Sequence, residues 1–155
     1  MHSTLKNDLE ILPSLLETAK QQGLNYLNEI DTRATSVKHS FQAKSKLDET
    51  GTGTLGALNE FNHRLEPLMV ASSGPRYWGF VTGGTTPAAM VGDWLTSVYD
   101  QNAQKVKGDG DISANIEIET IDLLLDLFGL PNDFFGGFVT GATMSNFTCL
   151  GVARQ

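Results

Sequence analysis

The chain has 155 residues, enough for one domain with a buried core, and its 40% hydrophobic and 19% charged residues are typical of folded rather than disordered proteins. Its formal net charge of −7, with scattered Lys and Arg side chains, argues against nucleic acid as a partner. No apolar run approaches the ~20 residues of a membrane span, and the N-terminus lacks the basic and apolar regions of a secretion signal. We therefore expect a cytoplasmic protein that does not enter membranes.

Metal and disulfide chemistry have no support in the sequence. His2, His39 and His63 lie far apart, and none has a metal-type spacing to another His, Cys or carboxylate. Cys149 is the only cysteine, which excludes an internal disulfide. Its neighbours Phe147 and Leu150 favour a packed thiol rather than a nucleophile.

The N-terminal third of the chain reads as helical. Leucines in residues 9–16 recur at helical spacing, and Pro13 is placed near a helix start, so residues 1–50 predict one or two helices outside a main core. After a turn-rich break at residues 48–54, the apolar spacing predicts an amphipathic helix that ends before Ser72. The residues that carry this second pattern are Leu58, Phe61, Leu65 and Leu68.

The middle of the chain alternates short irregular passages with helices. Residues 77–81 are apolar and aromatic, and we expect an extended, mostly buried passage. Thr86 and Pro87 form a good helix opening, with a hydroxyl at the N-cap and Pro in the first turn. A further helix is predicted from the apolar spacing of residues 118–128, and Gly129 and Pro131 stop it.

The C-terminal segment predicts a strand, a turn and a helix. Residues 137–140 resemble a strand, residues 141–144 a tight connection, and Ser145 and Asn146 the start of a helix that is still running at Gln155. Because a lone strand has no partner and the helix has no C-cap, we expect a truncated domain.

This strand-turn-helix segment is the best candidate for chemistry. Backbone N–H groups at a helix N-terminus attract phosphate, Gly141 permits a tight turn, and Thr143 and Ser145 supply hydroxyl donors. Such turns are also common packing devices in α/β proteins, so the residues alone leave a purely structural role open. Neither of the common nucleotide-binding glycine motifs is present.

Four collinear motifs give the chain a wider resemblance. They are GPRYWGFVTGG at residues 74–84 with PAA at 87–89 and DWL at 93–95; DIS at 111–113 through ET at 119–120; GLP at 129–131; and GFVTGATMSN at 137–146. Together they cover roughly residues 55–155, and the chain resembles the group II pyridoxal-phosphate (PLP)-dependent amino-acid decarboxylases, a family that includes aromatic-L-amino-acid, glutamate and diaminobutyrate decarboxylases.

The resemblance implies an α/β fold, the fold type I architecture of PLP enzymes. Residues 1–70 would be an N-terminal helical segment that packs on the other subunit of a homodimer, and residues 71–155 the beginning of the PLP-binding large domain. By the same resemblance, the loop of Ala142, Thr143, Met144 and Ser145 belongs to the cofactor's phosphate cup.

The resemblance also assigns two residues to the substrate side of the site. Thr82 matches a position that lines the active site near cofactor and substrate, whereas the structural alternative is a turn threonine beside Gly83 and Gly84. Phe80 stands where glutamate-specific members carry an amide side chain, so glutamate is a less attractive substrate.

No catalytic residue is assigned within the chain. In the family the Schiff-base lysine lies beyond the point that matches Gln155, and Lys105 and Lys107 sit in a polar loop where a solvated charge is expected. We therefore predict that this polypeptide alone is inactive. Two alternatives stay open: an inactive fragment or pseudo-enzyme that acts as an interaction module, and another fold type I activity such as an aminotransferase.

Overall fold

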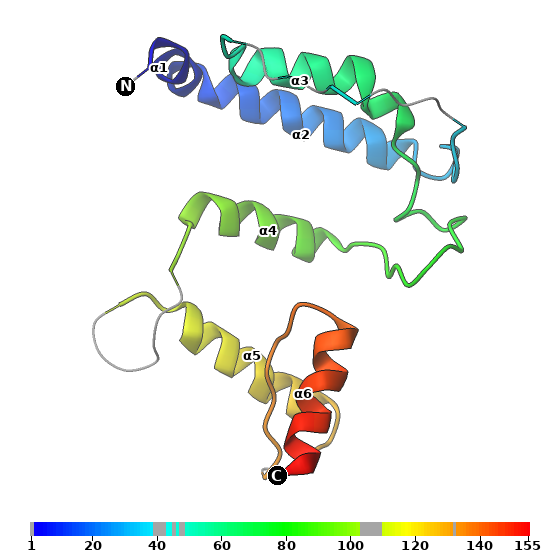
Figure 1. Cartoon of the computed structure of the whole chain (residues 1–155), viewed down its shortest axis with the longest axis vertical. Coiled ribbons are helices and arrows are strands. Elements are labelled where there is room, and N and C mark those ends of the chain that lie inside the picture. The colour runs from blue at the N-terminus through cyan, green and yellow to red at the C-terminus, as the bar shows by residue number, and fades with distance from the viewer. Residues whose placement is uncertain (1, 39–42, 45, 47–48, 103–109, 132) are drawn as a thin grey trace. The chain divides into compact units, whose positions relative to one another are not determined.

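A computed structural model of the chain describes residues 2–38, 43–44, 46, 49–102, 110–131 and 133–155. The chain divides into two compact units, Met1–Pro87 and Ala88–Gln155 (Figure 1). All regular secondary structure in the described ranges is helical, and none of these helices combines the length and apolarity needed to cross a bilayer. The α/β fold class and the domain boundary near residue 70 stay predictions.

The first unit opens with two helices, α1 (Ser3–Glu10) and α2 (Leu12–Asn28). Ile11 separates them, and Pro13 lies in the first turn of α2, where its missing N–H costs no hydrogen bond. The hydroxyl of Ser14 donates to the Ile11 carbonyl at 2.7 Å. The prediction of one or two helices in this region is confirmed, with two.

The next helix is α3 (Gly53–Arg64), followed by the short 3-10 helix η1 (Glu66–Leu68). The single helix predicted through Leu68 is therefore divided after Arg64. The reason is that Pro67 has no N–H to continue the series of α-helical hydrogen bonds. Helix α3 lies beside α2 (Figure 1). Gln22 Nε2 donates to Asn62 Oδ1 across this pair at 2.8 Å.

A carboxylate of α1 holds the first turn of α3. Asp8 Oδ2 accepts from the backbone N–H of Thr54 at 2.9 Å and from its hydroxyl at 2.8 Å. Gly53 has φ +71°, and a Cβ there would lie 3.0 Å from Thr4 Cγ2 and 3.1 Å from Asp8 Oδ1. A glycine therefore allows α1 and α3 to approach.

The second unit contains α4 (Pro87–Tyr99, with its first residue at the boundary), α5 (Ser113–Leu127) and α6 (Ala142–Arg154). The helix predicted to open at Pro87 and the helix predicted to stop at Gly129 are confirmed. Gly129 has φ +64°, its N–H donates to the Asp126 carbonyl, and the N–H of Leu130 donates to Leu125. These two bonds form a Schellman motif that ends α5.

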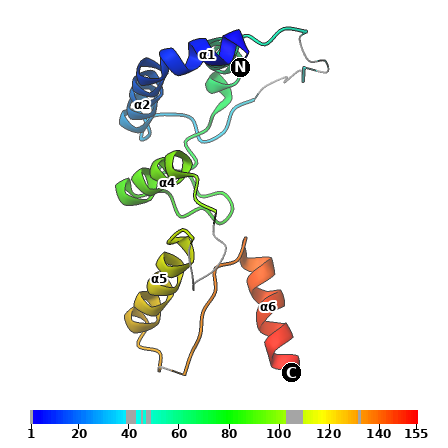
Figure 2. The ribbon, with the colours of Figure 1, turned by 90° about the vertical axis from the view of Figure 1, so that its left-hand side faces the viewer.

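The predicted strand at residues 137–140 is wrong for this structure. Residues 137–139 lie in an irregular segment between α5 and α6 (Figure 2). A strand needs a neighbouring strand to accept its hydrogen bonds, and no described segment supplies one. The segment approaches α5 at Gly136, where a Cβ would lie 2.8 Å from Ile121 Cγ2.

Two predictions of burial are also wrong. Trp78, Phe80 and Val81 are 92%, 96% and 103% exposed, and Cys149 is exposed as well. Among the described residues only Leu15 and Ala71 are buried hydrophobic side chains. Apolar composition indicates a tendency to be covered, but burial requires neighbouring atoms that the described residues do not provide.

Candidate functional site

The four residues expected to hold phosphate form the first turn of α6. The helix begins at Ala142 after Gly141, and the N–H of Ser145 donates to the Gly141 carbonyl at 3.0 Å. The prediction of a loop up to Met144 followed by a helix from Ser145 is therefore corrected: the helix starts three residues earlier. The reason is that nothing in residues 142–144 resists helical backbone angles, and the turn is closed by the first i to i−4 bond.

This turn has the groups that a phosphate needs. The N–H groups of Ala142, Thr143 and Met144 have no acceptor within the helix, and Gly141 has no side chain with which to cap them. Thr143 and Ser145 add hydroxyls, and residues 142–145 are all exposed. No atom lies within 4 Å of a Cβ built on Gly141, so the approach is open. The turn therefore fits a phosphate dianion.

Phe80 and Thr82 lie in a bent segment of the first unit. Phe80 has φ +56°, an uncommon value for a residue other than glycine. The Thr82 hydroxyl lies 3.4 Å from the Gly79 carbonyl, to which it donates within the turn. This contact is the one expected of a turn threonine. Phe80 and Thr82 belong to the first unit, and the α6 turn belongs to the second.

The lysine that carries PLP in such enzymes would have to lie near the phosphate turn, so the surroundings of each described lysine matter. In the first unit, Lys6 pairs with Glu10 at 4.0 Å, Lys20 with Glu17 at 2.6 Å and Lys44 with Glu60 at 3.7 Å. Lys105 and Lys107 lie outside the described residues. The described part of the second unit thus presents no lysine beside the α6 turn. The described residues also contain no group of three or more His, Cys, Asp or Glu side chains suited to a metal ion.

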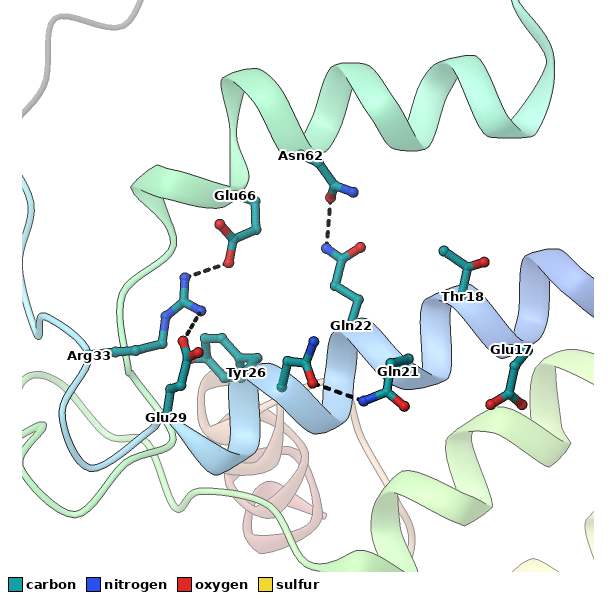
Figure 3. Close-up of a pocket in the computed structure, with 10 residues that line it drawn as sticks. Glu17, Thr18, Gln21, Gln22, Tyr26, Glu29, Arg33, Asn62 and Glu66 are labelled. Atoms are coloured by element: carbon teal, nitrogen blue, oxygen red, sulfur yellow. Dashed lines mark hydrogen bonds and ion pairs between the residues drawn. The ribbon is translucent and has the colours of Figure 1, made fainter.

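Sequence reasoning missed a polar cleft of about 830 Å³ in the first unit (Figure 3). At one end, Arg33 Nη2 lies 2.5 Å from Glu66 Oε1 and Arg33 Nη1 lies 3.5 Å from Glu29 Oε2. The guanidinium carbon lies 4.9 Å from the centre of the Tyr26 ring. The i to i+4 spacing of Glu29 and Arg33 is a local sequence signal for their ion pair. Glu66 is 33 residues from Arg33, so no local signal predicts that second pair.

The N-terminus of α5 differs from that of α6, because a carboxylate of the chain binds it. Asp111 Oδ1 accepts from the backbone N–H of Ser113 at 2.8 Å at the start of α5. The side-chain hydrogen bond with Ser113, followed by that backbone bond, holds the pKa of Asp111 below its ordinary value. The N-terminus of α5 is therefore occupied by the chain's own carboxylate, whereas that of α6 has no side-chain cap.

Comparison with known proteins relates the chain to a curated decarboxylase. The chain is 30% identical over 110 residues to an aromatic-L-amino-acid decarboxylase of Bacillus atrophaeus. The matched stretch covers 70% of this chain and 22% of that relative, so the chain spans about a fifth of the relative's length. No protein-family model matches the chain. No solved structure matches it either. The similarity relates the chain to a decarboxylase.

Proposed function

We propose that this chain supplies the cofactor-phosphate turn of a PLP-dependent amino-acid decarboxylase. The observation that carries the proposal is the first turn of α6, an uncapped and exposed helix N-terminus with two hydroxyl residues. The similarity to an aromatic-L-amino-acid decarboxylase supports the same activity class. Together the two observations favour this role.

In this proposal, the residues of the chain bind and orient the cofactor. The N–H groups of residues 142–144 and the hydroxyls of Thr143 and Ser145 hold the phosphate, which fixes the cofactor at one end. When bound, PLP would supply the electron sink that a decarboxylation requires. The lysine that carries the cofactor, and the acid at its ring nitrogen, come from residues outside these 155.

The proposal for the substrate depends on Phe80 and Thr82. An aromatic side chain at Phe80 cannot pair with a second carboxylate, which disfavours glutamate, and we propose an aromatic amino acid as substrate, the class named for the relative. We further propose that the complete protein has the fold type I architecture and is a homodimer. In it, residues 1–70 pack on the other subunit.

The test is a titration of the ¹⁵N-labelled 155-residue chain with PLP, inorganic phosphate and pyridoxal, followed by amide shifts. PLP and phosphate are expected to move the amides of residues 142–145, and pyridoxal, which has no phosphate, is expected to leave them in place. Thr143→Val and Ser145→Ala should each weaken PLP binding about tenfold, because a hydrogen bond to a charged group contributes about 1.5–3 kcal/mol.

Thr148→Val is the matched control. Thr148 is one turn further along α6, and its hydroxyl donates to the Met144 carbonyl at 2.9 Å inside the helix. Its replacement should leave PLP binding unchanged. Equal shifts with pyridoxal and PLP, or shifts that avoid residues 142–145, would contradict the proposal.

A further inference from the structure

Residues 70 and 71 are hydrogen-bonded to α2 and to the segment that follows it. The N–H of Ala71 donates to the Ala34 carbonyl at 2.9 Å, and the Tyr26 hydroxyl donates to the Val70 carbonyl at 2.9 Å. Ala71 is 1% exposed, the most buried hydrophobic side chain among the described residues. This junction therefore contains the most buried hydrophobic residue that the structure describes in the first unit.

Arg33 joins the parts of this junction. Its guanidinium binds Glu29 at the end of α2 and Glu66 in η1, and packs over the Tyr26 ring (Figure 3). Its backbone carbonyl accepts from Arg76 Nη2 at 2.5 Å. The Arg33 side chain is 19% exposed and the Glu66 side chain 29%, so solvent screens this pair less than the other ion pairs among the described residues of the unit.

The junction ends where the exposed loop begins. A Cβ on Gly74 would lie 3.0 Å from Ile30 Cγ1 and 3.2 Å from the Ile30 carbonyl, so the chain passes close to the end of α2. The N–H of Tyr77 then donates to the Gly74 carbonyl at 3.2 Å. Trp78 follows directly and is 92% exposed.

We propose that Arg33 is a positioning residue for the loop of residues 77–84. Its side chain acts on residues 70–76 through Glu66 and through the Tyr26 ring, whose hydroxyl binds the Val70 carbonyl, and it thereby sets the point from which Phe80 and Thr82 extend. The inference rests on the proposed function, which gives these two residues their role toward the substrate. Different contacts hold the helices themselves, namely Asp8 with Thr54 and Gln22 with Asn62. Loss of Arg33 should therefore loosen the loop origin more than the helix pairs.

The experiment measures hydrogen exchange, residue by residue, on the full 155-residue chain. Arg33→Ala and Glu66→Gln should raise exchange at the amides of Ala71 and Tyr77 about tenfold, with less than a twofold change in the middle of α2 and α3. The amide signals of Phe80 and Thr82 should shift in both variants. Arg33→Lys should recover part of the protection because it keeps the charge, but it loses the forked geometry.

Two further variants separate positioning from general stability. Asp8→Ala breaks the bonds between α1 and α3 in the same unit. In this variant the amides of Ala71 and Tyr77 should stay protected from exchange, whereas those of α1 and α3 should lose protection. The exchanged pair Arg33→Glu with Glu66→Arg should restore more protection than Arg33→Glu alone. A uniform rise across α2 and α3 in Arg33→Ala, or no rise at Ala71 and Tyr77, would overturn the inference.

The same samples distinguish this inference from the proposed function. The phosphate-dependent shifts at residues 142–145 should persist in the Arg33 variants. If those shifts are absent even in the unsubstituted chain while Ala71 and Tyr77 respond to Arg33, the proposed function fails and the inference loses its substrate role. If the shifts occur and the two amides do not respond, the positioning inference alone fails.

Discussion

At the scale of single residues, Asp111 shows how one side chain starts a helix. Its carboxylate accepts the N–H of Ser113 in the first turn of α5, a donor that has no acceptor within the helix. The Ser113 bonds hold the Asp111 pKa below the ordinary value of 3.8, because they favour the ionised form.

This shift predicts an acid-sensitive helix start. A carboxyl whose pKa is lowered by folding contributes stability that is present above the unfolded pKa and is lost as the pH falls through the folded pKa. The first turn of α5 should thus fray below about pH 4, as read from the Cα shifts of Ala114 and Asn115. Asp111→Ala should fray it at neutral pH, and Asp111→Asn should do so less because an acceptor is kept. A pH-independent turn would contradict this assignment.

The roles proposed for single residues differ in how far they can be predicted from the sequence. Thr143 and Ser145 follow a glycine at the start of a helix, a local pattern from which the turn proposed to bind phosphate can be located. The role of Arg33 could not be predicted from sequence, because its partner Glu66 is distant in the chain. No local pattern distinguishes Arg33 from the other arginines.

At the scale of elements, the contact between α1 and α3 depends on one carboxylate and one glycine. Asp8→Ala should lower the free energy of unfolding of the first unit by about 1 kcal/mol, the usual cost of losing a helix cap. Gly53→Ala should cost at least as much, because its φ of +71° disfavours any side chain. Urea unfolding followed by circular dichroism measures both.

Gly51 is the control for this pair of variants. A Cβ built on Gly51 meets no atom within 4 Å, so Gly51→Ala should leave the unfolding midpoint unchanged or slightly raised. If Asp8→Ala and Gly53→Ala both behave like Gly51→Ala, the contact does not stabilise the unit.

The helices were predictable because their signals are local. Apolar residues at helical spacing, Pro87 at a helix start and Gly129 at a helix end define elements from their own sequence. The strand at residues 137–140 failed because pairing depends on a partner that local sequence does not specify. The buried passage at residues 77–81 failed for a related reason, since covering atoms come from elsewhere in a fold.

At the scale of the whole molecule, the exposed apolar side chains of the second unit are the main feature. Trp94 is 52% exposed, and Phe147 and Leu150 of α6 are 72% and 70% exposed. Exposed apolar surface of this kind is typical of interaction surfaces. In the proposed decarboxylase, further residues of the complete protein would cover these helix faces.

The central claim is that the chain provides a phosphate-binding turn for PLP without the lysine that carries the cofactor. The measurement that tests it most directly is borohydride reduction of the chain with PLP, followed by peptide mapping and an assay of CO₂ release from aromatic amino acids. We predict label scattered over surface lysines and no CO₂. One lysine labelled to stoichiometry, with CO₂ released, would contradict the account and place a complete active site within these 155 residues.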